Sequence, residues 1–362
     1  MADTYRVGIA GCGSIARLHA RGYQGVDGME IVCLADPVPE ALDRFGEELG
    51  VERRYEDYRR MFDEEELDII SICTWHKLHM PMTVAACARR PQAVLCEKPM
   101  ATNLGECDQM LIAARRNDVK LAIAHQRRFN PAWVRARDLV AEGAIGQVRQ
   151  ITAVGGQGLL NDCSHLLDMM RFVLGDPQAV WVMGNVERKT DRYERDVRIE
   201  DRSLGVVQFD NGAVGQLLQE LGGRHYQGGI FYGTDGVLEL DEQKLRLLSG
   251  SSGGWRELPG EGEDPSVGQA RELAAWIEGK VEHRGQGENA RAAVEIIMGI
   301  YESARRHEVV SVPVRTMASP LDVMIDAGDL PVERPGRYDI RAMLLKGEAM
   351  QGKSAIEPDG LV

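Results

Sequence analysis

The chain has 362 residues and a mass of 40.1 kDa, a length that predicts about two domains and a sizeable core. It carries 43 Lys and Arg against 56 Asp and Glu, so its net charge is −13, which disfavours a nucleic-acid partner or an anionic membrane surface. It contains no apolar run of about 18 residues. The sequence also lacks the layout of a signal peptide near Met1, so we expect a cytoplasmic protein.

The seven cysteines are odd in number and include no C-x-x-C pair. Neither a disulfide framework nor a thiolate zinc site is therefore indicated. Most of the cysteines lie in apolar runs, so we expect small buried side chains in a reducing compartment. They are Cys12, Cys33, Cys73, Cys87, Cys96, Cys107 and Cys163.

Short apolar runs alternate with helical segments in the first third of the chain. This alternation favours a parallel, doubly wound α/β sheet in a domain spanning residues 1–124. The expected strands are Tyr5–Ala10, Met29–Ala35, Leu67–Cys73, Ala93–Cys96 and Lys120–Ala124, and the expected helices are Ser14–Gln24, Glu40–Leu49 and segments near 80–89 and 104–116.

Residues 125–315 are expected to form an α+β domain with a large, mostly antiparallel sheet. The turn Asp210-Asn211-Gly212 between two apolar runs is a hairpin signal. We expect residues 249–264 to form a loop, and helix 287–306 to pack back on the first domain. The expected helices are 131–142, 160–174, 266–279 and 287–306, and the expected strands are 148–154, 204–209, 213–220, 229–232, 237–240, 245–248 and 309–312.

The last segment, residues 316–362, has four prolines and little periodicity. We expect it to be either an arm that wraps a neighbouring subunit or a mobile tail.

A glycine-rich turn directly follows the first predicted strand and opens a helix. This context supports a dinucleotide-binding motif of the form G-x-G-x-x-A. Gly13 would let a diphosphate approach the backbone at the helix N-terminus. Asp36, which ends the second strand, would accept hydrogen bonds from a ribose and repel a 2′-phosphate, so NAD is favoured over NADP. The turn consists of Gly11, Cys12, Gly13, Ser14, Ile15 and Ala16.

Two further groups of polar residues are candidates for chemistry. Glu97-Lys98-Pro99 follows a strand, where an open α/β sheet binds its ligand, although a lysine is more often a solvated surface charge. On a helix Asn161, His165 and Asp168 would share one face. A histidine with such neighbours is an acid/base candidate rather than a structural residue.

A metal site is only weakly indicated. His76 and His79 are three residues apart near a helix start, but no carboxylate or thiolate stands at ligand spacing beside them. We therefore expect no metal.

Taken together, these motifs resemble the Gfo/Idh/MocA oxidoreductases over about residues 5–313. The motifs that carry the resemblance are the glycine turn, Cys73-Thr74 followed by His79, Glu97-Lys98-Pro99, Gln126-Arg127-Arg128-Phe129, and Asn161 with His165 and Asp168. The resemblance implies a Rossmann domain followed by an open-faced sheet domain, with homodimers or homotetramers formed through that sheet. It also implies oxidation of a sugar or cyclic polyol, or the reverse reduction.

The resemblance also implies roles for individual residues. Lys98 would stabilise a developing alkoxide, and His165 would be the general base. Pro99 would follow a cis peptide bond. Arg127, Asn161 and Asp162 would join Lys98 and His165 in binding the substrate, and the remaining cofactor contacts would come from Thr74, Trp75, His79, Glu97 and Lys98.

Three features depart from the family pattern. Asn161 replaces a common Asp, so it can orient a hydroxyl but cannot relay a proton. Trp75 stands where a proline is usual, and it would stack on cofactor or sugar or simply pack at the domain edge. The segment 155–158 is shorter than the usual loop, so the pocket would be more open or closed by another element, such as the 316–362 tail. An open pocket would suit a larger glycoside or a nucleotide sugar.

Three functions remain compatible with the sequence. The leading one is an NAD-dependent sugar or polyol dehydrogenase with Lys98 and His165 at the reacting hydroxyl. The alternative is a glycoside-cleaving enzyme that oxidises its substrate transiently and eliminates the aglycone. The third is a non-catalytic NAD- or sugar-binding regulator, against which the retention of Lys98 and His165 speaks.

Overall fold

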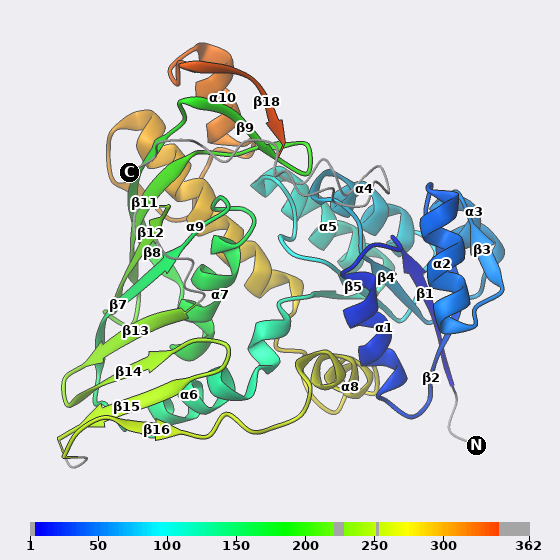
Figure 1. The fold of residues 1–362 in the computed structure, drawn as a ribbon, viewed down its shortest axis with the longest axis horizontal. Coiled ribbons are helices and arrows are strands. Elements are labelled where there is room, and N and C mark those ends of the chain that lie inside the picture. Colours follow the sequence, from blue (N-terminus) through cyan, green and yellow to red (C-terminus); the bar gives the residue numbers. More distant parts are fainter. Residues whose placement is uncertain (1–3, 221–227, 251–252, 340–362) are drawn as a thin grey trace.

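The computed structural model describes residues 4–220, 228–250 and 253–339. Two α/β lobes lie side by side, each built on its own large sheet (Figure 1). The N-terminal lobe carries the first sheet, and the second lobe carries the larger one. Helices of both lobes lie between the two sheets. The ends of the strands of the first sheet therefore face the helices of the second lobe.

The N-terminal sheet has six parallel strands in the order β3-β2-β1-β4-β5-β6, which is the doubly wound arrangement expected from the sequence. The strand order reverses between β1 and β4, where such sheets bind ligands. The strands are Tyr5–Ala10, Met29–Ala35, Arg53–Tyr55, Ile69–Ile72, Ala93–Cys96 and Lys120–Ile123 (β1 to β6), and the helices are Ala16–Gln24, Pro39–Leu49, Tyr58–Glu64, His76–Cys87 and Leu104–Asn117 (α1 to α5).

Polar side chains begin several of the helices. Asn103 accepts a hydrogen bond from the Glu106 amide at the start of α5, and Asp57 accepts one from the Arg59 amide at the start of α3. Such caps satisfy amides that have no partner inside the helix. The strand β3 and the helix α3 were not predicted from the sequence, and both lie in a stretch rich in charged residues.

The second sheet has nine strands in the order β16-β15-β14-β13-β7-β12-β11-β8-β17. Among the described strands of this sheet only β7 and β12 pair in parallel, so the sheet is mixed but mostly antiparallel, as expected. The strands are Val148–Gly155, Ala179–Glu187, Arg202–Phe209, Val214–Gln219, Gly228–Gly233, Gly236–Leu240, Leu245–Ser249, Arg256–Leu258 and Val310–Ser311 (β7, β8 and β11 to β17).

Helices cover one face of this sheet and leave the other face without a helix in the described part of the chain (Figure 1). Glycines on the covered face permit close packing, because a side chain at Gly184 or Gly205 would collide with Ile300 of α9. The α9 helix also contacts α5 and β6 of the first lobe. The helices of this lobe are η1 Gln126–Phe129, α6 Pro131–Ala141, α7 Cys163–Val173, α8 Pro265–Ile277 and α9 Gly287–Arg306.

Two expectations for this lobe were wrong in detail. The α7 helix begins at Cys163 rather than at 160, so Asn161 lies in the turn before it. The stretch 249–264 is not only loop, because Arg256–Leu258 forms the edge strand β16 against β15.

The described part of the C-terminal segment packs on its own chain. Residues Pro320–Ala327 form α10, which contacts α9, and Arg334–Asp339 forms β18. The β18 strand pairs in parallel with β9, Thr190–Glu194, which also pairs with β10, Val197–Arg198. Residues 316–339 thus pack on their own chain, residues 340–362 lie outside the described part, and the arm stays a prediction.

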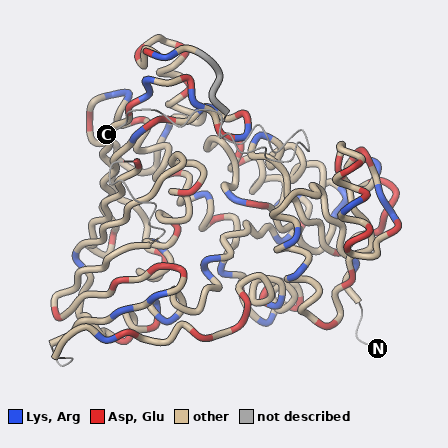
Figure 2. The backbone as a smooth tube through the Cα atoms, in the orientation of Figure 1, with Lys and Arg blue, Asp and Glu red and all other residues tan. Residues whose placement is uncertain are grey.

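Acidic and basic residues are interspersed along the backbone of both lobes rather than separated (Figure 2). Many of them form ion pairs between neighbouring elements, such as Arg291 with Asp108 and Arg115 with Glu288. All seven cysteines are buried and none forms a disulfide, as expected. No helix among the described residues is long and apolar enough to span a membrane.

Candidate active site

The glycine turn after β1 has the geometry that a bound diphosphate needs. Gly11 has φ +96°, and a side chain there would come within 2.4 Å of the Cys73 carbonyl oxygen, so only glycine fits. A side chain on Gly13 would meet nothing within 4 Å, which leaves open space over the backbone. Ser14 is exposed and Ile15 partly exposed just before α1, and Ala16 is buried against the sheet. The turn therefore fits a dinucleotide.

Asp36 lies beside this turn at the end of β2. Its carboxylate accepts hydrogen bonds from the Cys12 amide at 2.7 Å and from the Val38 amide at 2.9 Å. These bonds fix the carboxylate while leaving it partly exposed. An anion held at this position suits the two hydroxyls of an adenosine ribose.

Lys98 and Asn161 meet at the edge of the sheet. Lys98 follows β5, precedes a cis peptide bond to Pro99 as the resemblance implied, and places its Nζ 3.3 Å from Asn161 Oδ1. Burial lowers the pKa of Lys98, whereas Glu97 and Asp162 oppose this shift. Asn161 is 1% exposed, and its Nδ2 has no hydrogen-bond partner in the described part of the chain.

His165 lies on α7, four residues after Asn161. Its ring is buried, and Nδ1 has no hydrogen-bond partner among the residues that the structure describes. Burial, assisted by the nearby charges of Arg127 and Lys98, lowers the pKa of His165 well below 6.5. A neutral imidazole beside a lysine is the form that a general base requires.

Asp168, three residues after His165 on α7, is bound by a buried arginine. Its carboxylate binds Arg128 through three contacts of 2.7 to 3.0 Å, and Arg128 is 0% exposed. His125, whose Nδ1 is 3.5 Å from Asp168, packs edge-to-face on His165 with ring centroids 5.7 Å apart. Asp168 is therefore connected to His165 through His125.

We expect Asp168→Asn to lower the free energy of unfolding by about 3 kcal/mol, because it leaves the buried Arg128 guanidinium without its main counter-charge. Urea unfolding measures this change. Asp63→Asn is the matched control, since the pair of Asp63 with Arg89 is largely exposed and should contribute less than about 0.5 kcal/mol. Equal effects of the two substitutions on the free energy of unfolding would contradict the large contribution of the Arg128–Asp168 pair.

Two residues expected at the cofactor are engaged by the protein itself. His79 is fully buried, with Nδ1 2.7 Å from the Pro99 carbonyl and Nε2 3.0 Å from the Thr74 carbonyl. It connects the loop after β4 with the turn that carries Lys98. Glu97 is held by His19 at 2.9 Å, and although burial alone would raise the pKa of Glu97, His19 and Lys98 lower it.

Thr74 and Trp75 follow β4, and both are partly exposed just before α4. Arg127 forms an ion pair with Glu242 and still lowers the pKa of His165 through its charge. Asp162 lies immediately before α7 and is partly exposed.

A short hairpin of β9 and β10 reaches this region from the second lobe. Arg195, at its tip, has φ +49° and directs its guanidinium to within 3.5 Å of Asn161 Oδ1 and 3.3 Å of His76 Nε2. Glu194 forms an ion pair with Arg195 at 3.0 Å, and Asp196 forms one with Lys77 of α4. The hairpin is thereby attached to both lobes.

Sequence reasoning missed His125 and Arg195. His125 lies two residues after β6, as Lys98 lies two residues after β5, and that position could have indicated it. Arg195 stands in no motif, and only the hairpin brings it to Asn161. Within the described ranges, no group of three or more His, Cys, Asp or Glu residues is placed to hold a metal ion.

The glycine turn, the parallel sheet and the lysine after β5 are the features of an NAD-binding oxidoreductase. Residues 5–125 match the family model for an oxidoreductase family with an NAD-binding Rossmann fold, and residues 149–312 match its C-terminal alpha/beta domain. The chain belongs to the Gfo/Idh/MocA oxidoreductase family.

Among its relatives, myo-inositol 2-dehydrogenase from Thermotoga maritima is 28% identical over 227 residues, which cover 59% of this chain and 67% of that protein. D-apiose dehydrogenase from Paraburkholderia graminis is 30% identical over 189 residues, covering 48% of this chain and half of that relative. A structure of levoglucosan dehydrogenase with NADH and levoglucosan superposes with TM-score 0.77 at 21% identity, covering 86% of this chain and all of that one.

Proposed function

We propose that this protein is an NAD-dependent dehydrogenase that oxidises a hydroxyl group of a sugar, sugar derivative or cyclic polyol, or catalyses the reverse reduction. The observation that carries the proposal is the contact of Lys98 with Asn161, four residues before a buried His165, after the strand β5. The similarity of the chain to inositol and sugar dehydrogenases gives further support.

NAD, when bound, supplies the hydride acceptor, and three side chains act on the substrate. His165 removes the hydroxyl proton through its neutral imidazole. Lys98 stabilises the alkoxide that develops as the proton leaves. Asn161 orients the same hydroxyl through its amide. Arg127, Asp162 and the hairpin residue Arg195 lie around this group and contribute to the choice of substrate.

An NADH-absorbance screen tests this proposal with a panel of sugars, inositols, sugar acids and glycosides. Each reaction is also assayed for release of an aglycone. Formation of NADH with one compound class supports the dehydrogenase. Release of aglycone without net NADH would replace it with a glycoside-cleaving reaction on the same fold, and NAD binding without either reaction would favour a regulator.

The cofactor is NAD rather than NADP, because the carboxylate of Asp36 would repel a 2′-phosphate. We expect Asp36→Asn to reduce the preference for NAD⁺ over NADP⁺ by about tenfold, since the repulsion is worth on the order of 1 kcal/mol at a hydrated surface. Titration calorimetry with both dinucleotides measures the ratio. Asp43→Asn is the control, because Asp43 is an exposed residue of α2 that pairs with Arg54. An unchanged ratio in the Asp36 variant would contradict the assignment.

We also propose that the uncovered face of the nine-stranded sheet forms a homodimer or homotetramer. Pairing register puts Met183, Leu204 and Tyr232 on that face, where they are 43%, 39% and 39% exposed. Light scattering after gel filtration tests this, with Leu204→Glu expected to shift the mass toward the monomer.

A further inference from the structure

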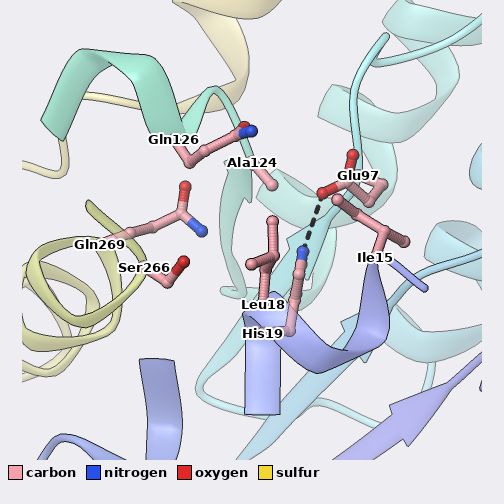
Figure 3. Close-up of a pocket in the computed structure, with 8 residues that line it drawn as sticks. All are labelled: Ile15, Leu18, His19, Glu97, Ala124, Gln126, Ser266 and Gln269. Carbon is pink, nitrogen blue, oxygen red and sulfur yellow. Dashed lines mark hydrogen bonds and ion pairs between the residues drawn. The ribbon is translucent and has the colours of Figure 1, made fainter. Parts of the chain in front are cut away.

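A small cavity lies between α1 and α8, beside the expected course of the cofactor (Figure 3). Its walls come from the start of α1, the ends of β5 and β6, and the first two turns of α8. Ile15 and Glu97 line it on the side of the first lobe, and Gln126, Ser266 and Gln269 line it on the other side. None of the roles proposed above uses the two glutamines.

Both glutamine side chains point toward the cavity (Figure 3), and each has a buried amide oxygen without a hydrogen-bond partner within the described ranges. Gln269 is only 3% exposed. A buried acceptor without a donor costs about 1–3 kcal/mol, so two of them beside one cavity indicate a ligand with N–H or O–H groups. Glu97 does not need such a ligand, because His19 at 2.9 Å and the Lys98 amide at 3.1 Å already bind it.

The location identifies the part of the cofactor that would reach this cavity. Ile15 comes two residues after Gly13, where the diphosphate is expected, and Glu97 directly precedes Lys98, where the chemistry is expected. The nicotinamide end of NAD must span these two points. Its carboxamide carries two N–H donors and one acceptor oxygen, which two glutamine amides complement.

We propose that Gln126 and Gln269 form the subsite for the nicotinamide carboxamide, with its amide group donating to the two Gln oxygens. This inference deepens the cofactor part of the proposed function and rests on it. By holding the carboxamide from η1 and α8, the two glutamines fix the rotation of the nicotinamide ring and so the face that it presents to Lys98.

Titration calorimetry on the full chain tests the subsite without any turnover. The probes are NAD⁺, ADP-ribose, which lacks nicotinamide, and 3-acetylpyridine adenine dinucleotide, whose methyl ketone has no N–H. We expect the unmodified protein to bind NAD⁺ about tenfold more tightly than the acetylpyridine analogue, because the loss of one hydrogen bond lowers the affinity by about that factor. Gln126→Leu and Gln269→Leu should each weaken NAD⁺ binding about tenfold, leave ADP-ribose binding unchanged and shrink the difference between NAD⁺ and the analogue.

The control is Gln24→Leu, at the exposed end of α1, which should leave all three affinities unchanged. Equal affinities of NAD⁺ and the analogue for the unmodified protein would overturn the proposal and leave water as the occupant of the cavity. Equal weakening of NAD⁺ and ADP-ribose by the variants would overturn it in favour of a structural role. If ADP-ribose and NAD⁺ both fail to bind the unmodified protein, the cofactor assignment itself falls.

Discussion

Replacing Lys98 with methionine should lower kcat/KM by about 10²- to 10³-fold while NAD⁺ still binds. The loss is expected because a preorganised cation beside a developing oxyanion contributes about that factor, and Lys98 Nζ is held at the substrate edge 3.3 Å from Asn161 Oδ1. Methionine keeps the length and apolar stem of the side chain but removes the charge. Steady-state rates with the substrate found by screening, together with NAD⁺ affinity by calorimetry, measure the two quantities.

The matched control is Lys280→Met, at an exposed position after α8, which should leave both quantities unchanged. A Lys98 variant that retains most of its rate would exclude Lys98 from the reaction. Equal losses of rate and NAD⁺ affinity would instead make Lys98 a cofactor-binding residue.

Replacing His165 with asparagine should lower kcat/KM by about 10²- to 10⁴-fold, the range for removal of a general base. The pH profile of the unmodified enzyme provides a second readout. Because burial lowers the pKa of His165 below 6.5, the imidazole stays neutral and competent at neutral pH. Activity should therefore persist below pH 6.5 before protonation of His165 reduces it, and this acidic limb should vanish from the residual activity of the variant.

His307→Asn serves as the control for this substitution, since His307 is an exposed residue that ends α9 with a positive φ, a conformation that asparagine accepts. An activity that already falls between pH 7.5 and 6.5, where an ordinary histidine titrates, would contradict a depressed pKa. A variant with unchanged rate would transfer the role of base to another group.

The fold of the first lobe could be predicted because its signals are local. A buried strand such as Tyr5–Ala10 followed at once by Gly11 and Gly13 specifies a strand, a turn and a helix within a few residues. The elements that escaped prediction lack such signals. The strand β3 has only three residues, of which Arg53 and Arg54 are charged, and it is stabilised by pairing with β2 rather than by its own pattern.

The candidate site residues could be named from motifs, but their contacts could not be predicted. Helical spacing predicted that Asn161, His165 and Asp168 share one face, yet Asn161 lies in the turn before α7, and spacing says nothing of what a helix packs against. Arg128 binds Asp168, and that pairing joins residues that are 40 positions apart in the sequence. The β9–β10 hairpin, whose Arg195 reaches Asn161, stands in no sequence motif.

The pairing of β18 with β9 bears on the order in which the protein can be completed during synthesis. The β9–β10 hairpin gains its third strand only from the end of the described chain, after α8, α9 and α10 have been made. Such a non-local pairing forms late, because the intervening chain must be ordered before the two strands meet. A nascent chain can thus build both large sheets before β18 leaves the ribosome. Pairing of β18 with β9 then stabilises the hairpin that lies over Lys98 and Asn161.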